Sequence, residues 1–331
     1  MYATRISCLL AVFALAACQP AKDVKIIGSI ERADPALDNV VSADAGATIL
    51  AEGFTWSEGP VWVEKYKMVL FSDVPQDTVY KWTAEKGKEV YLTPSGYTGT
   101  TPTRSKERGS NGLLLNARGQ LVLCQHGDRR VAVMNAPLDQ PASNFTTLAD
   151  RYQGKRFNSP NDAVFDRQGN LYLTDPPYGL EKKELDPDKE TPFQGVYKVY
   201  PNGKVTVLVD SLTKPNGIAL SPDQKFLWVA NSDPAKKRWY RYALGDSTVT
   251  SGKLVNDVTS QTEPGLPDGM KINSKGIVFA SGPGGIQIFD PEGKFLGKIK
   301  LPGATANCAL SQDEKTLFIT SNKYLLSVPL K

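Results

Sequence analysis

The stretch PNGIALSPDQKFLWVAN, from Pro215 to Asn231, consists of two apolar runs separated by a polar turn. This order is typical of a β-hairpin. An amide, Asn216, stands just before the first run, and a second amide ends the unit. Five further stretches repeat the same order of residue types and begin at Ser57, Ser110, Pro160, Pro267 and Ala306. The chain therefore repeats one hairpin six times, and no stretch has a convincing helical period.

The spacing of these units indicates the architecture. They recur roughly every 40 to 55 residues, the period of a four-stranded propeller blade. Only YLLSVPL follows the last unit, whereas the run Ala47–Ala51 precedes the first unit much as VTVLVD precedes the fourth. The sequence therefore predicts an all-β fold, a six-bladed β-propeller whose N-terminal strand completes the last blade and closes the ring.

Composition excludes several classes of function. The 331 residues carry Lys+Arg 39 against Asp+Glu 35, and a net charge of +4 is too small and too scattered to indicate a nucleic-acid partner. One histidine excludes a multi-histidine zinc site. Four cysteines cannot build a disulfide scaffold at this length. We expect Cys124 and Cys308 to be small buried residues, with a disulfide between them left open.

The chain opens with MYATRISCLLAVFALAACQP, a basic start followed by an apolar run of about ten residues, as in a secretory signal peptide. This run is too short to span a membrane, because a membrane-spanning helix needs about 20 apolar residues. The end of this segment, Leu15-Ala16-Ala17-Cys18, looks like a bacterial lipobox. We expect residues 1–17 to be a lipoprotein signal peptide, 18–43 a tether and lead-in, and 44–331 the propeller.

The same segment predicts where the protein resides. In bacterial lipoproteins the signal is cut before a cysteine that carries lipid, so Cys18 would anchor a periplasm-facing protein of the cell envelope. Gln19 after this cysteine favours the outer membrane over the inner membrane. Membrane contact is expected through the lipid anchor only. Ordinary secretion, with cleavage elsewhere, is the alternative.

One position of the repeat holds an acid or an amide in every unit. Equivalent positions of successive blades are related by rotation about the central axis, so these six side chains are expected to converge at the channel mouth. Carboxylate and amide oxygens are the ligands that Ca²⁺ or Mg²⁺ prefers. Turn or cap residues are the alternative, since Asn-Gly and Asp-Gly favour turns. The residues are Glu58, Asn111, Asn161, Asn216, Asp268 and Asn307.

A second polar position comes 14 or 15 residues later in each unit. The ends of an antiparallel hairpin meet, so this second set should lie beside the first. Four of its members would orient the ligands, and ordinary strand-end turn residues are the alternative. The residues are Asp73, Gln125, Asp175, Asn231, Gly282 and Ser321.

At these residues the chain resembles the gluconolactonase branch of the family that contains regucalcin (senescence marker protein). The matching stretches include EGPVW at Glu58, SNGLLLNARGQLVLCQHGDRRV at Ser110 and NSPNDAVFDRQGNLYLTDPPYGL at Asn158. The match begins near residue 50 and continues to the C-terminus. It implies a six-bladed propeller that binds one divalent cation at its axis and hydrolyses a sugar lactone.

The resemblance also implies roles for individual residues. It places metal ligands on Glu58, Asn216 and Asp268, and makes Asn161 a fourth ligand or a substrate contact. Calcium is the expected ion because all the ligands are oxygens, while magnesium, manganese and zinc stay open. Diisopropyl fluorophosphatase and paraoxonase use a similar acid–amide quartet, so these ligands alone do not define the substrate.

The expected hydrolysis depends on binding of the lactone carbonyl to the cation. A cation polarises the lactone carbonyl and stabilises the tetrahedral oxyanion. Asp268 is the candidate that activates water or attacks directly. Asn111 and Asn307 are expected to hold substrate hydroxyls.

Three residues outside the repeated position are further candidates for substrate contact. His126 and Arg129 follow the second hairpin, where they would meet the substrate or lie on a surface loop. Tyr178 leads into the charged insertion EKKELDPDKETPFQG, which would form a lid or a solvated loop.

Three functions are compatible with this reading. The first is a metal-dependent lactonase acting on an aldonolactone such as glucono-lactone. The second is a related metal-dependent esterase or phosphotriesterase, and the third is a non-catalytic envelope sensor or scaffold. The complete acid–amide set favours an enzyme, because a scaffold needs none of it. The chain has no G-x-S-x-G sequence, so a serine-hydrolase triad has no support.

Overall fold

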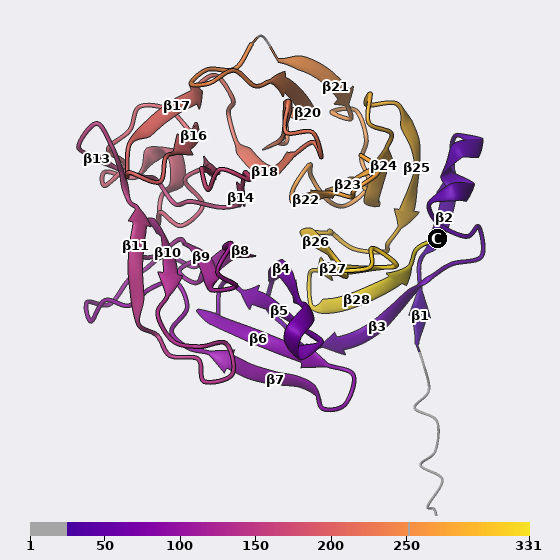
Figure 1. Cartoon of the computed structure of the whole chain (residues 1–331), viewed down its shortest axis with the longest axis horizontal. Coiled ribbons are helices and arrows are strands. Elements are labelled where there is room, and N and C mark those ends of the chain that lie inside the picture. The colour runs from indigo at the N-terminus through magenta and orange to yellow at the C-terminus, as the bar shows by residue number, and fades with distance from the viewer. Residues whose placement is uncertain (1–24, 251) are drawn as a thin grey trace, which may run out of the picture.

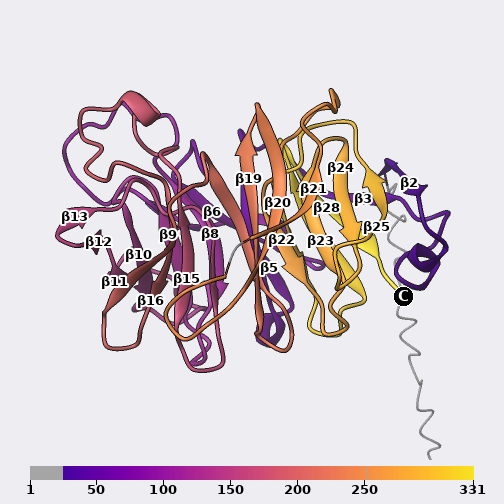
Figure 2. The same ribbon diagram turned by 90° about the horizontal axis from the view of Figure 1, so that it is seen from above.

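The structure is a computed structural model in which residues 25–250 and 252–331 are described. The predicted signal peptide and Cys18 lie outside these residues. Six sheets surround a central axis (Figure 1), and their strands run along the direction of that axis (Figure 2). This arrangement confirms the predicted six-bladed β-propeller. No helix within the described residues is long and apolar enough to cross a membrane.

The first four blades are four-stranded antiparallel sheets built from consecutive strands. Blade one contains β4 (Ser57–Val63), β5 (Met68–Asp73), β6 (Thr78–Thr83) and β7 (Gly87–Leu92). Blade two contains β8 (Ser110–Leu115), β9 (Leu121–Gln125), β10 (Arg130–Met134) and β11 (Phe145–Ala149). Blade three contains β14 (Ala163–Phe165), β15 (Leu171–Asp175), β16 (Gly195–Val199) and β17 (Val205–Val209). Blade four contains β18 (Pro215–Leu220), β19 (Phe226–Asp233), β20 (Lys236–Ala243) and β21 (Lys253–Asp257).

The last two blades each have five strands, because N-terminal strands join them. Blade five contains β22 (Met270–Ile272), β23 (Val278–Gly282), β24 (Gly285–Phe289), β25 (Phe295–Lys300) and β2 (Ser29–Arg32). Blade six contains β26 (Asn307–Leu310), β27 (Thr316–Ser321), β28 (Tyr324–Pro329), β3 (Ala47–Glu52) and β1 (Ile26–Ile27). The remaining elements are the hairpin β12 (Arg151–Tyr152) and β13 (Lys155–Arg156), and the 3₁₀ helices η1 (Pro35–Asn39), η2 (Glu64–Tyr66) and η3 (Lys183–Leu185).

The ring closes as the sequence predicted. Strand β3 pairs antiparallel with β28, with Glu52 opposite Tyr324 and Thr48 opposite Ser327. N-terminal and C-terminal strands therefore share one sheet, and no blade edge is left open at the junction (Figure 1).

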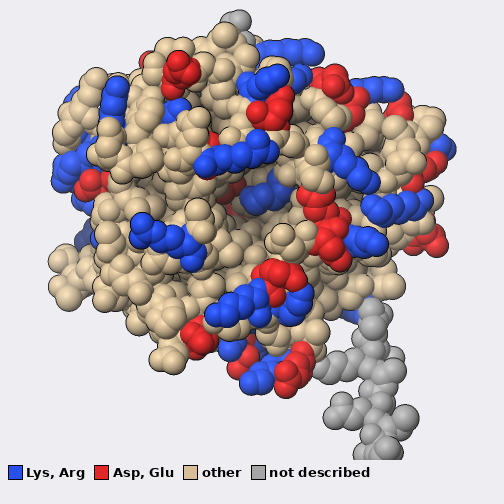
Figure 3. All heavy atoms as spheres, in the orientation of Figure 1, with Lys and Arg blue, Asp and Glu red and all other residues tan. Residues whose placement is uncertain are grey.

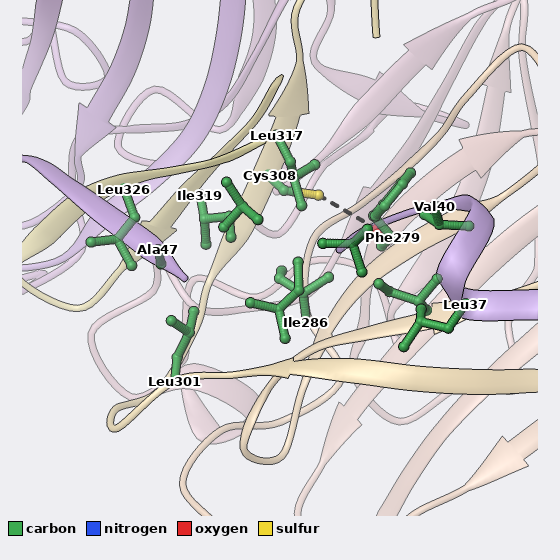
Figure 4. Packing of buried hydrophobic residues seen from close by; sticks show 14 of the residues in the cluster. Leu37, Val40, Ala47, Phe279, Ile286, Leu301, Cys308, Leu317, Ile319 and Leu326 are labelled. Atoms are coloured by element: carbon green, nitrogen blue, oxygen red, sulfur yellow. Dashed lines mark hydrogen bonds between the residues drawn. The ribbon is translucent and has the colours of Figure 1, made fainter. Parts of the chain in front are cut away.

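The segment before residue 44 also takes part in the fold. Strand β1 pairs with β3, and β2 pairs with β25. Between β2 and β3, Leu37 of η1 is 1% exposed and packs in the core of the last two blades (Figure 4). The sequence did not indicate these contacts, because strands of two and four residues carry no readable hydrophobic period.

Hairpin turns follow a common local chemistry. In four of them the side-chain oxygen of an Asn or Asp accepts the backbone N–H groups two and four residues later. This Asx-type bonding stabilises a tight turn without help from other segments. The residues are Asn116, Asp166, Asn273 and Asp290.

Cys124 and Cys308 are free and fully buried. Each belongs to a different hydrophobic cluster, as expected for small apolar residues. On the face that Figure 3 shows, acidic and basic side chains are intermixed around a central hollow.

Candidate active site

The repeated acid–amide position lies where each innermost strand begins. Glu58, Asn111 and Asn216 are the second residues of β4, β8 and β18. Asn307 opens β26, while Asn161 and Asp268 stand two residues before β14 and β22. Neighbouring innermost strands contact each other around the ring. The Asn-Gly and Asp-Gly pairs therefore lie in or beside the inner strands and not in the hairpin turns.

The strand pairing is irregular at the repeated position, and the residue that follows this position in the sequence explains why. In blades one, two and four the pairing register shifts next to the repeated residue. Glycine follows it in four units, because the next inner strand approaches too closely for a side chain. A Cβ atom on Gly59 would lie 2.0 Å from the Asn111 carbonyl oxygen, and one on Gly217 would lie 2.1 Å from that of Asp268. Small residues thus allow the inner strands to meet at the axis.

Five of the six repeated residues line one cavity of about 520 Å³. They are Glu58, Asn111, Asn161, Asn216 and Asp268. Tyr178 also lines this cavity, together with an apolar wall formed by Trp56, Pro75 and Leu266. The structure therefore brings a set of carboxylate and amide side chains and an apolar surface into one space, the usual composition of a small-molecule site.

Asn307 lies outside the lining of this cavity. Its Nδ2 donates to Oδ2 of Asp162 at 3.4 Å, and its Oδ1 accepts the Cys308 N–H at 2.8 Å. Asp162 is 2% exposed and lies 4.0 Å from the Lys271 ammonium. Asp162 stands directly after the repeated residue, where four other units have glycine, and this departure was the available signal for it.

The two carboxylates of the cavity disfavour each other's charged form. Burial raises the pKa of Glu58, and the nearby Asp162 raises it further. Burial also raises the pKa of Asp268 well above its usual range, and repulsion from Glu58 adds to this shift. Two carboxyl groups in a low-dielectric space behave in this way when no cation compensates their charge.

The fit of these residues to a cation can be judged from their unpaired oxygens. Oδ1 of Asn111 and Oδ1 of Asp268 are buried and have no hydrogen-bond partner within the described residues. Buried acceptors normally have a partner, and a hard divalent cation supplies one. The described residues contain no group of three or more His, Cys, Asp and Glu placed to bind a metal. The candidate set consists instead of two carboxylates and several amides, which fits a hard cation such as Ca²⁺.

His126 is placed away from this cavity. Its side chain is fully buried, and neither ring nitrogen has a partner within the described residues. It packs under the start of the insertion, since a Cβ atom on Gly179 would lie 2.7 Å from the His126 Cβ. Burial lowers the pKa of His126 to about 4, so the ring is neutral at physiological pH.

Arg129 holds the insertion in place. Its Nε donates to the carbonyl oxygens of Phe157 at 2.7 Å and Asn158 at 3.1 Å, and its Nη1 donates to that of Asp188 at 2.9 Å. It lines a different cavity, of about 710 Å³. Arg129 therefore connects the insertion to the segment that leads to Asn161.

In three of the six units, the residue at the second position accepts N–H groups of the backbone that precedes the repeated acid or amide. Asp73 accepts the N–H groups of Thr55 and Trp56, at 2.9 and 3.0 Å. Asp175 accepts those of Asn158 and Ser159, both at 2.8 Å, and Asn231 accepts that of Lys214 at 2.9 Å. In each case the bonded residues stand two or three positions before a repeated acid or amide. In these three units the second position thus fixes the backbone beside the repeated acid or amide.

Sequence reasoning missed several residues of the cavity. Trp56 donates its indole N–H to Glu58, and Ser232 donates its hydroxyl to the Pro267 carbonyl just before Asp268. Glu107, from the segment before β8, and Lys183, the first residue of η3, line the cavity and form an ion pair at 3.9 Å. The positions of Trp56 and Ser232 recur in every unit but hold different residue types there, so the repeat pattern did not mark them.

Comparisons with known proteins identify relatives over most of the chain. Residues 56–323 match the family model described as the SMP-30/Gluconolactonase/LRE-like region. A gluconolactonase of Zymomonas mobilis is 37% identical over 313 residues, which cover 92% of this chain and 87% of that protein.

Solved protein structures also superpose on this chain. A gluconolactonase of Xanthomonas campestris superposes with a TM-score of 0.79 at 29% identity, covering 95% of this chain and 99% of that one. Regucalcin of Agrobacterium tumefaciens, described as a calcium-binding protein, has a TM-score of 0.65 at 18% identity and shares the fold. The superposition covers 86% of this chain and 94% of the regucalcin chain. The chain is a lactone hydrolase, and it belongs to the SMP-30/gluconolactonase/LRE-like family.

Proposed function

We propose that this enzyme opens a sugar lactone, an aldonolactone such as glucono-lactone, with the help of one divalent cation at the propeller axis. The observation that carries the proposal is the cavity in which Glu58 and Asp268 meet three amides, with two buried oxygens that no described residue pairs by a hydrogen bond. The names of the gluconolactonase relatives support this substrate class.

Glu58, Asn161, Asn216 and Asp268 would hold the cation. When bound, it would polarise the lactone carbonyl and stabilise the oxyanion. Calcium is the preferred ion, because carboxylate and amide oxygens suit hard cations and a relative of the same fold is described as calcium-binding. Magnesium, manganese and zinc are the other candidates.

The chain's own residues perform the proton transfers. Oδ1 of Asp268 accepts no hydrogen bond from the described residues, so it is available to a water molecule. Asp268 takes a proton as the water oxygen bonds to the carbonyl carbon, and it returns this proton to the ring oxygen as the ring C–O bond breaks. The product is a single hydroxy acid, because the ring oxygen stays in the molecule as a hydroxyl group.

The rest of the cavity binds the substrate. Asn111 and Tyr178 lie on its lining, where they would contact ring hydroxyls. Trp56, Pro75 and Leu266 form an apolar wall suited to the C–H face of a sugar ring.

A soluble form lacking residues 1–18 provides the test. Hydrolysis of glucono-lactone should be lost on chelation and restored by one divalent ion. A panel with a phosphotriester and a simple ester identifies the alternative hydrolase. Melting that responds to the ion without turnover of any of these compounds would favour a sensor and contradict the proposed activity.

We also propose that the protein is a lipoprotein of the bacterial cell envelope, anchored through Cys18 and facing the periplasm. The lipobox-like LAAC and Gln19 support this location, and favour the outer membrane. Cys18→Ser should abolish labelling by a fatty-acid analogue and release the protein from the membrane fraction. Unchanged labelling would contradict the anchor.

A further inference from the structure

We infer that Trp56 is a positioning residue for the cation site: its indole N–H holds the Glu58 carboxylate in the orientation that binds the ion. This inference rests on the proposed metal-dependent function and assigns a role to a residue outside the repeated position. Trp56 stands two residues before Glu58, and the equivalent places in the other five units hold Gly109, Ser159, Lys214, Leu266 and Thr305.

The main chain of Trp56 is fixed independently of its side chain. Its N–H donates to Oδ1 of Asp73 at 3.0 Å, and its carbonyl oxygen accepts the Val74 N–H at 3.3 Å. The preceding Thr55 N–H donates to Oδ2 of Asp73 at 2.9 Å. The end of β5 thus holds the backbone on both sides of the tryptophan, which restricts where its ring can point.

The side chain completes the arrangement at Glu58. The indole Nε1 donates to Oε1 of Glu58 at 3.3 Å, and the Gly59 N–H donates to Oε2 at 3.0 Å. Each carboxylate oxygen therefore has one N–H donor and retains lone-pair capacity for a cation. Glu58 is 2% exposed, so the protein covers most of the surface around its carboxylate.

The need for this extra donor follows from the length of glutamate. Glu58 is the only glutamate at the repeated position, where the other units have Asn or Asp. Its side chain has one more rotatable bond, and freezing that bond on ion binding costs conformational entropy. A hydrogen bond that orients the carboxylate before the ion arrives reduces this cost. Partners that orient metal ligands typically contribute about 10-fold to 100-fold in affinity.

The same ring also belongs to the apolar wall of the cavity, next to Pro75 and Leu266. Trp56 therefore has two separable properties, a donor toward Glu58 and a ring surface along the cavity. Trp56→Phe removes the donor and retains an aromatic ring. Trp56→Ala removes both.

The chain offers a matched control. Trp62 donates its indole N–H to Oε2 of Glu64 at 2.7 Å, with the same two-residue spacing. This pair lies outside the lining of the cavity, and Trp62 stacks on Phe318 at 5.1 Å between ring centroids. Trp62→Phe removes an equivalent hydrogen bond without touching the proposed site.

The experiment titrates Ca²⁺ alone into the chelator-treated protein lacking residues 1–18, followed by calorimetry. Trp56→Phe should weaken the Kd about tenfold or more, while Trp62→Phe should leave it within about twofold. With saturating Ca²⁺, Trp56→Phe should recover part of its lost kcat, whereas Trp56→Ala, which also loses the ring surface, should raise KM for glucono-lactone further. Trp56→His should recover part of the lost affinity, because imidazole Nε2 can overlay indole Nε1.

The outcomes separate the two proposals. Tight Ca²⁺ binding by the wild type and an unchanged Kd in Trp56→Phe would overturn the role of Trp56 and leave the metal site standing. Absence of binding of Ca²⁺, Mg²⁺, Mn²⁺ and Zn²⁺ by the wild type would overturn the metal site and the inference with it. Melting of the ion-free variants checks folding. If Trp56→Phe melts at a lower temperature than the wild type, the comparison of the two variants decides. Trp56→His should then bind Ca²⁺ more tightly than Trp56→Phe, and equal Ca²⁺ affinities would overturn the inference.

Discussion

Asp268 and Glu58 differ in the hydrogen bonds that their carboxylate oxygens already accept. Glu58 receives one N–H on each oxygen, from Trp56 and from Gly59. Oδ1 of Asp268 receives none from the described residues. Glu58 is thus suited to hold an ion in a fixed orientation, while Asp268 retains an oxygen that can accept a proton.

Asp268→Asn should lower kcat for glucono-lactone by about 10²-fold to 10⁴-fold, because the amide retains the shape but cannot take a proton from water. The assay follows acid release at saturating Ca²⁺, with spontaneous hydrolysis subtracted. The ion-free protein should not lose stability, since the substitution removes a carboxyl group whose charged form is disfavoured by burial and by Glu58. A kcat within a few-fold of the wild type would show that another group accepts the proton.

His126 gives the protein a sensitivity to acid. Burial lowers the pKa of His126 to about 4, whereas in the unfolded chain its pKa is near 6.5. The neutral ring therefore contributes its full stability above pH 6.5, and this contribution is lost as the pH falls toward 4. His126→Leu should reduce the loss of stability between these pH values by up to about 3 kcal/mol. Denaturant unfolding at pH 7.5 and pH 4.5 measures the difference, and parallel losses in the two proteins would contradict it.

At the scale of elements, the cavity depends on how closely the inner strands meet. Gly217 of β18 lies against the backbone of the next blade, where a Cβ atom would lie 2.1 Å from the Asp268 carbonyl oxygen and 2.8 Å from the Gly269 Cα. These contacts involve main-chain atoms that cannot rotate away. The glycine therefore determines the position of Asp268 at the mouth.

Gly217→Ala should destabilise the protein by about 1–3 kcal/mol through overpacking and should lower kcat, because Asp268 must move. Gly303→Ala is the matched control, since a Cβ atom there would meet nothing within 4 Å. Melting temperature and turnover of both variants test this. Equal effects of the two substitutions would show that the close approach does not determine the site.

At the scale of the whole molecule, closure joins the two ends of the chain in one sheet. Strand β3 covers β28, while β1 and β2 extend the last two blades. Ala47 is fully buried and Ala51 is 9% exposed, so β3 belongs to the core of the ring. Without β3 the edge of β28 would be free to pair with other chains.

Removal of residues 1–52 should lower the Tm by on the order of 10 °C or more, or cause aggregation, because the ring loses its closing strand. Removal of residues 1–24, which precede β1, is the control and should leave the Tm nearly unchanged. Calorimetry and light scattering distinguish these outcomes. A truncated ring that melts like the control would show that closure contributes little to stability.

The amino-acid sequence by itself determined the six blades, the closing strand Ala47–Ala51 and the position of the acid–amide set. These features are encoded in contiguous residues, through alternating apolar runs and turn residues that recur at a regular spacing. Rotation about one axis then converts a repeated position into a shared site, so five residues separated by up to 210 positions could be assigned together.

Only the tertiary structure decided what surrounds that site. The direction of the Trp56 indole toward Glu58 is a side-chain conformation that the two-residue spacing does not specify. The pair of Glu107 and Lys183 arises where two non-repeated segments meet, and the bonding of Asn307 to Asp162 joins two blades that are distant in sequence. The same holds for the burial of His126 and for the carbonyl contacts of Arg129. Such contacts depend on the paths of loops that are distant in sequence, and no local hydrophobic period or turn residue encodes which side chain will face which partner.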